Sequence, residues 1–295
     1  MDTLTYTDSV HEGYERFWNE RRRADRQDFM ARLTGKEADL LPFERLMQIL
    51  QAYQQIPGRD IEMIPLDRIV GSVGRYRDFT RGFRPRAGIS GDRWVRVYRA
   101  MSSLEGVPPI EVYRLGDVYF VADGNHRVSA ARAAGFDKIA AYVTDIPVDP
   151  GLEPGDTLDT AIIKAERAFF MQQTGLEDRF GPVQDICFTK PHGYPRLFEH
   201  IQVHRYFMGL NREDGAEVSF AEAAADWYLT VYRPIVAAIQ RRRLLEQFPD
   251  STAADLYVWV SARILEAAQH AGQPIGPDEA AATLEERRSS AWQRA

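Results

Sequence analysis

The chain has 295 residues, of which 44% are hydrophobic and 27% charged, and its formal net charge is −6. This composition predicts a folded globular protein of two domains, or of one domain with a large extension, and the acidic charge argues against a general nucleic-acid coat. The single cysteine, Cys187, excludes an internal disulfide and a cysteine-based zinc cluster. The first ten residues lack an export signal and no apolar run reaches the ~20 residues of a membrane span, so we expect a cytoplasmic protein without a membrane partner.

Two helices are predicted at the start of the chain. The first covers about Asp8 to Leu33, where aromatic residues recur among many charges, and Gly35 follows as a stop signal. The second covers about Leu41 to Tyr53. Pro57-Gly58 comes after it and marks a turn, so residues 1–58 are predicted to be an N-terminal helical extension.

Residues 59–148 consist of short β-prone runs separated by turns, which predicts a small sheet domain. The turn Leu115-Gly116-Asp117 lies between two such runs and predicts a β-hairpin. The expected strands are Ile61–Ile64, Ile69–Val70, Ile110–Arg114, Val118–Val121 and Ile139–Val143.

An arginine-rich loop is predicted between the second of these strands and the hairpin. Its cations are Arg75, Arg77, Arg81, Arg84, Arg86, Arg93, Arg96 and Arg99. Only Asp78 and Asp92 balance them within this run. So many cations imply either an anionic ligand or an acidic surface elsewhere in the fold, and the sequence leaves both interpretations open.

The most informative motif is Asp123-Gly124-Asn125-His126-Arg127, which stands between a β-prone run and an alanine-rich segment that closes at Gly135. This order predicts a strand, a tight turn and a helix. The first N–H groups of such a helix have no intrahelical acceptor and can bind a phosphate, to which His126 and Arg127 would add side-chain donors. In the alternative interpretation Asp123 only caps the helix and the two cations are solvated.

The order of elements around this motif resembles the ParB/sulfiredoxin-like domain superfamily. The similarity covers roughly Ile61 to Ile146: a short strand at Ile64-Pro65-Leu66, an arginine-rich loop, a strand at Pro109-Ile110, a hairpin, the motif, an alanine-rich helix and a closing strand. In that superfamily the Gly-x-x-Arg turn and the following helix N-terminus bind nucleotide phosphates. The resemblance therefore implies an α+β fold with a small mixed sheet and phosphate binding at Gly124, Asn125, His126 and Arg127.

Variants of the motif within the superfamily narrow the expected chemistry. Partition proteins carry Gly-Glu-Arg-Arg, so Asn125 and His126 stand in the places of Glu and the first Arg. Sulfiredoxin carries a cysteine where this chain has Asn125, which excludes sulfinic acid repair, because Cys187 lies outside the domain. Serine kinases that use a nucleotide donor carry the more similar Asp-Gly-His-His-Arg, and some members of the superfamily have been labelled nucleases.

Two classes of function follow. The first is a nucleotide-binding protein in which Arg75 and Arg77 complete the anion site. If it also hydrolyses nucleotides, transfers phosphoryl groups or cleaves phosphodiesters, Asp78 and Asp123 are the carboxylates available to a Mg²⁺ ion or as a base. The second is a non-enzymatic regulatory module with a nucleotide as its switch, or a DNA-associated regulator, although no helix-turn-helix follows the motif. The sequence leaves the base and the oligomeric state open.

Residues 149–295 are predicted to form a C-terminal helical domain. The capping box at Ser219 and Glu222 opens one of its helices, and Pro234 is expected to kink or break that helix. The other expected helices are Leu158–Thr174, Tyr194–Met208, one from Ser251 or Thr252 to about His270, and one opened by Pro277. This half resembles the C-terminal region of an uncharacterised bacterial family through Trp227-Tyr228, Tyr232 with Pro234, and Phe248-Pro249.

Other candidate sites are weaker. His200 and His204 are four residues apart on a predicted helix, near His192, but the pattern is not that of metalloproteases, and we assign no metal site. The chain has neither a Gly-x-x-x-x-Gly-Lys phosphate loop nor a Gly-x-Gly-x-x-Gly fingerprint.

The short strands bury little apolar area, so aromatic side chains of both flanks are expected to cover the sheet. These side chains are Tyr14, Phe17, Trp18, Phe169, Trp227 and Trp259.

Overall fold

The computed structural model describes residues 3–35, 37–52, 55–101, 106–210, 212, 216–271 and 275–292. The chain forms two compact units, and the division falls between Ala161 and Ile162. Each unit contains its own cluster of buried apolar side chains. The predicted domain boundaries at residues 58 and 148 stay predictions.

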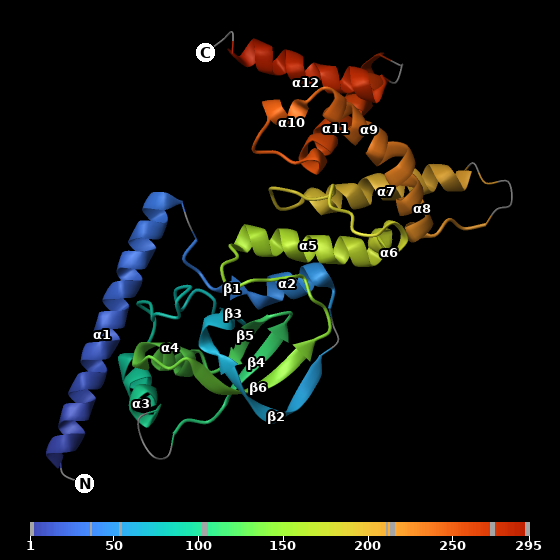
Figure 1. Ribbon diagram of the computed structural model, residues 1–295. Helices are drawn as coiled ribbons and strands as arrows, with labels where there is room; N and C mark the ends of the chain where they lie inside the picture. Colours follow the sequence, from blue (N-terminus) through green and yellow to red (C-terminus); the bar gives the residue numbers. More distant parts are fainter. Residues whose placement is uncertain are drawn as a thin grey trace. The chain divides into compact units, whose positions relative to one another are not determined.

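A six-stranded mixed sheet forms the centre of the first unit (Figure 1). The strand order is β1-β3-β5-β4-β6-β2. The pairs β3–β5 and β4–β6 are parallel, whereas β4–β5 and β2–β6 are antiparallel. The predicted α+β class with a mixed sheet is therefore confirmed. The strands are β1 (Leu41–Pro42), β2 (Ile56–Pro65), β3 (Ile69–Ser72), β4 (Ile110–Leu115), β5 (Val118–Asp123) and β6 (Lys138–Ile146), with a 3₁₀ turn at Leu66–Arg68.

Helices cover both faces of this sheet. Those of the first unit are α1 (Thr3–Thr34), α2 (Phe43–Leu50), α3 (Gly91–Met101) and α4 (Asn125–Ala134). Val112 and Val121 pack in one core with residues of α1, α3 and α4. Tyr113 points to the opposite face because side chains alternate along a strand, and there it stacks on Phe43 of α2 at 4.6 Å.

Helix α3 differs from the prediction, which treated residues 75–99 as a loop because of their many arginines. The Trp94 amide donates to the carbonyl of Ser90 (3.2 Å), and Trp94 and Val95 are buried. Trp94 also stacks on Tyr98, one helical turn later, at 5.3 Å. That four-residue spacing of aromatic side chains was the signal for an amphipathic helix.

The second unit is helical, as predicted. Its helices are α5 (Leu158–Thr174, which begins in the first unit), α6 (Leu176–Phe180), α7 (Gly193–Leu210), α8 (Phe220–Trp227), α9 (Arg233–Arg241), α10 (Leu244–Gln247), α11 (Ala253–Ala271) and α12 (Pro277–Trp292). The Ser219 hydroxyl accepts from the Glu222 amide at 3.1 Å, which confirms the predicted cap. A π-helical turn, Tyr228–Tyr232, follows α8, and Pro234 lies in the first turn of α9. The helix is therefore irregular just before Pro234, but its backbone stays helical through this turn.

The prediction that both flanks cover the sheet is wrong in part. Phe17 of α1 is fully buried in the first core and lies 5.6 Å from Trp94. Trp18, in contrast, is 53% exposed. Trp227 and Trp259 pack in the core of the second unit, with other residues of that unit. The first core is thus closed mainly by α1, α3 and α4.

Candidate functional site

The predicted strand, turn and helix are present at the motif. β5 ends at Asp123, Gly124 is the N-cap, and α4 begins at Asn125. Gly124 has φ +116°, and a Cβ atom there would lie 2.5 Å from Cγ2 of Ile110. A larger residue would strain the backbone and collide with β4, so glycine is required at this turn.

The N-terminus of α4 presents backbone donors. The first intrahelical bond of the helix runs from the Val128 amide to the Gly124 carbonyl at 3.0 Å. The amides of Asn125, His126 and Arg127 precede it, and Gly124 has no side chain to cap them. These three N–H groups and the positive end of the helix dipole favour an anion.

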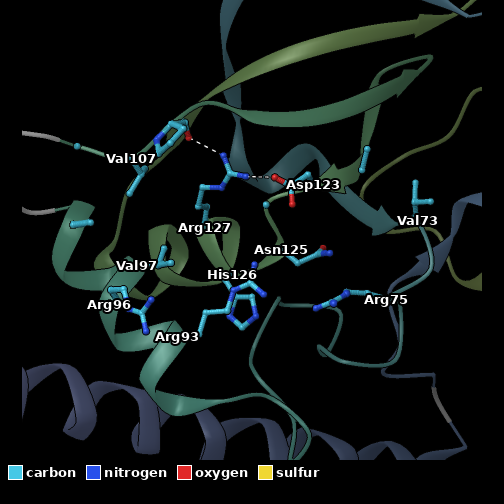
Figure 2. A pocket seen from close by; sticks show the side chains of 15 residues that line it. Val73, Arg75, Arg93, Arg96, Val97, Val107, Asp123, Asn125, His126 and Arg127 are labelled. Carbon is cyan, nitrogen blue, oxygen red and sulfur yellow. Dashed lines mark hydrogen bonds and ion pairs between the residues drawn. The ribbon is translucent and has the colours of Figure 1, made fainter.

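A cavity of about 400 Å³ opens in front of this helix end. Figure 2 shows Arg93 and Arg96 of α3 on one side of it and Arg75 on the other, with Asn125 and His126 between them. Apolar side chains complete the wall, among them Val73, Val97 and Val107. The site thus combines cations and backbone donors with an apolar surface.

Asn125 and His126 are buried but incompletely satisfied. They are 6% and 7% exposed, and Oδ1 of Asn125 and Nδ1 of His126 have no hydrogen-bond partner within the described chain. A buried polar atom without a partner costs about 1–3 kcal/mol, which a ligand would recover. Such groups are rare in folded proteins, and a ligand in the cavity is one way to satisfy them.

The environment of His126 keeps its imidazole neutral. Burial is the largest cause that lowers the pKa of His126 to about 4; the nearby Arg93 and Arg75 contribute to the same shift, and Asp78 acts in the opposite direction. The ring also packs edge-to-face on Phe79 at 5.7 Å. At neutral pH His126 therefore offers a hydrogen bond to a ligand but no positive charge.

The Arg127 side chain forms hydrogen bonds and an ion pair within the protein. Its Nη1 donates to the carbonyl oxygens of Pro108 (2.9 Å) and Pro109 (2.5 Å), and its Nη2 pairs with Asp123. The side chain is only 16% exposed. Arg127 therefore holds the segment that leads into β4, and Asp123 offsets its charge. Arg127 also lines the cavity, and the phosphate contact that the resemblance implied for it stays a prediction.

The two carboxylates named as metal ligands differ in their relation to the cavity. Asp123 lines the cavity and is engaged by Arg127, whereas Asp78 is not among the lining residues. Asp123 is the one carboxylate among the described lining residues. Arg77 lies elsewhere, with its guanidinium 5.4 Å from the centre of the Tyr76 ring, and it lines a separate hollow.

The arginine-rich segment divides into two groups: one pairs with acidic groups of the fold, and for the other the anionic ligand stays a prediction. Arg84 pairs with Glu20 of α1 at 3.1 Å, and Arg86 pairs with Asp28 of α1 at 2.7 Å. Arg75, Arg93 and Arg96 have exposed side chains that line the cavity, with no hydrogen-bond or ion-pair partner among the described residues. The sequence prediction missed Arg93 and Arg96 as site residues because it did not predict α3.

The histidines of the second unit face separate partners. Nδ1 of His200 lies 3.1 Å from the Tyr257 hydroxyl, and Nε2 of His204 lies 2.7 Å from Asp226. Within the described ranges no group of three or more His, Cys, Asp or Glu side chains could hold a metal ion.

Neither protein-family models nor curated proteins match the chain. Part of it is similar to the crystal structure of sulfiredoxin from Arabidopsis thaliana, with 18% sequence identity and a TM-score of 0.24. The aligned part covers 29% of this chain and 84% of that chain. Along the described residues no helix has the length and apolar character to cross a membrane. The proposal below rests on the geometry of the cavity.

Proposed function

We propose that the cavity at the start of α4 binds a phosphate-bearing small molecule, with nucleotides as the ligand class. One observation carries the proposal: backbone donors at the N-terminus of α4, the cations Arg75, Arg93 and Arg96, and the unsatisfied imidazole of His126 all line one cavity. The unsatisfied Oδ1 of Asn125 is an acceptor and suits a hydroxyl or N–H group of the ligand. Neutral ligands would leave the three cations without a partner.

Each part of the cavity has a role in this proposal. The amides of residues 125–127 bind phosphate oxygens, and the guanidinium groups bind the same oxygens in pairs, a geometry that suits arginine. Val73, Val97 and Val107 contact the organic part of the ligand. The volume of about 400 Å³ lies within the ~300–1,000 Å³ of small-molecule sites.

The proposal is one of binding. The described lining residues include no Ser, Thr, Cys, Lys or Tyr that could act as a nucleophile. They also do not fit a Mg²⁺ ion held by Asp78 and Asp123, because only Asp123 lines the cavity and Arg127 already occupies it. We therefore derive no reaction step through a metal.

A binding experiment with Asn125→Asp tests the proposal. The substitution changes almost no volume and places a carboxylate where phosphate would bind. The helix N-terminus offsets part of the cost of this buried charge, and the Tm of the ligand-free variant measures the remainder. The matched control is Asn19→Asp on the exposed surface of α1.

The wild type and the control should be stabilised by adenosine, cytidine or guanosine triphosphate. At a ligand concentration of 100 times Kd the gain is about 2.7 kcal/mol, which raises the Tm by roughly 5–10 °C. Asn125→Asp should lose this shift. If no nucleotide or inorganic phosphate shifts the wild-type Tm, the proposal is wrong.

A further inference from the structure

Three guanidinium groups without carboxylate partners surround the cavity at the start of α4. Three other arginines of the same segment bind groups of the protein. Arg84 and Arg86 form ion pairs with acidic side chains of α1, and Arg81 donates to the carbonyl oxygens of Pro154 and Asp156. The cations of the cavity are not engaged in this way. Among the described residues, Arg75, Arg93 and Arg96 have no side-chain hydrogen bond or ion pair.

The side chains that line the cavity therefore carry a net positive charge. Asp123 and Arg127 cancel each other as an ion pair, and His126 is neutral. What remains on the wall is the charge of three arginines. Arg93 and Arg96 lie three residues apart on α3 and therefore on one face of the helix.

This excess positive charge favours a ligand with more than two negative charges. A phosphate monoester carries about two negative charges, because its second pKa is about 6, and would leave part of the cluster unpaired. An oligophosphate distributes three or four charges over several oxygens. Enzymes usually offset that charge with Mg²⁺ bound by one or two carboxylates and the phosphates. Here the carboxylate among the described lining residues, Asp123, is already paired with Arg127.

Resting on the proposed function, we propose that Arg75, Arg93 and Arg96 form a built-in counter-charge, with which the cavity binds an oligophosphate chain without a divalent metal. The arginines take the place that the metal has in other oligophosphate sites. The amides of residues 125–127 bind one phosphoryl group and α3 binds the remainder of the chain. The apolar wall makes a nucleoside triphosphate a better ligand than inorganic tripolyphosphate.

Calorimetry on the full chain tests this, with adenosine triphosphate, adenosine monophosphate and inorganic tripolyphosphate as probes, each with EDTA and with Mg²⁺. In EDTA the triphosphate should bind at least about tenfold more tightly than the monophosphate, a difference of 1.4 kcal/mol. Added Mg²⁺ should tighten binding by less than about threefold. The ion neutralises phosphate charge that the arginines pair in its absence, so it adds little attraction between ligand and cavity.

Variants connect the result to α3. Arg93→Gln and Arg96→Gln should each weaken triphosphate binding about tenfold or more and reduce the preference over the monophosphate. Both side chains are exposed, so the Tm should stay unchanged. Arg99→Gln is the control on the same helix, since Arg99 is not among the lining residues.

The outcomes separate the two proposals. Binding that requires Mg²⁺, or that Mg²⁺ tightens more than threefold, would overturn this inference and leave phosphate binding in place. Equal affinity for triphosphate and monophosphate, or unchanged affinity in both α3 variants, would also overturn it. If none of the probes binds, the proposed function fails as well.

Discussion

Arg127→Ala should destabilise the first unit, because this side chain holds the segment before β4. It removes two hydrogen bonds, to the carbonyl oxygens of Pro108 and Pro109, and the ion pair with Asp123. A shielded hydrogen bond from a charged donor contributes about 1.5–3 kcal/mol. The bond to Pro108 is exposed, and an exposed ion pair adds only ~0.5 kcal/mol. We therefore expect a loss of about 2–3 kcal/mol, equivalent to about 4–12 °C in Tm.

Urea and thermal denaturation followed by circular dichroism measure this loss. Asp123→Asn is the matched control, since it removes only the ion pair and should cost less than about 1 kcal/mol. Arg127→Lys keeps the charge but cannot bond both carbonyl oxygens through one planar fork, so it should fall between the two. A Tm for Arg127→Ala within 1–2 °C of wild type corresponds to a loss of less than about 1 kcal/mol in the free energy of unfolding. This result would refute the structural role of Arg127 and favour a role in ligand binding.

Three further predictions concern the motif and its support. Nuclear magnetic resonance should give His126 a pKa of about 4. Because this lies below the unfolded value of ~6.5, stability should fall as the pH drops from about 6.5 towards 4, and a midpoint near 6.5 would contradict the burial argument. Gly124→Ala should cost at least about 1–3 kcal/mol in urea denaturation, whereas Gly155→Ala, with open space around the added Cβ, should be nearly neutral; equal costs would count against strain at the turn. A fragment of residues 61–146 lacks α1 with Phe17 and should give a poorly dispersed spectrum, and a dispersed one would show that the flank is dispensable.

The hairpin and the motif helix could be predicted from sequence because their signals are local. Gly116 and Gly124 have φ values of +58° and +116° at the two turns, and Gly135 ends α4 in the left-handed region with φ +82°. Glycine at such positions is a direct consequence of backbone sterics. The same reasoning located the ends of α5 and the cap of α8.

Helix α3 could not be predicted from charge patterns alone. Its arginines suggested a solvated loop, but Trp94 and Val95 form a buried face, and the Trp94 indole donates to the Ser129 hydroxyl at 2.8 Å. That contact links α3 to α4 across 35 residues. The spacing of Trp94 and Tyr98 indicates a helix, but the position of Arg93 beside the cavity depends on this tertiary packing, which local propensity does not encode.

The roles within the motif also depend on long-range contacts. Sequence reasoning placed residues 123–127 at a helix N-terminus, where the structure has them, but it gave Arg127 no partner within the protein other than its neighbours in the motif. Its acceptors are the carbonyls of Pro108 and Pro109, which lie 19 and 18 residues earlier. Backbone carbonyls have no residue-specific signature, so such a partner is not visible in the sequence.

The most direct test of phosphate binding follows the backbone amides of residues 125–127 in a ¹⁵N-labelled full chain. On addition of adenosine triphosphate in EDTA, these amides and the side-chain amide of Asn125 should show the largest shift changes, with smaller changes along α3. Charge-assisted hydrogen bonds to the amides are the physical cause. Saturable shifts confined to other parts of the protein, or none at all at millimolar nucleotide, would contradict the account.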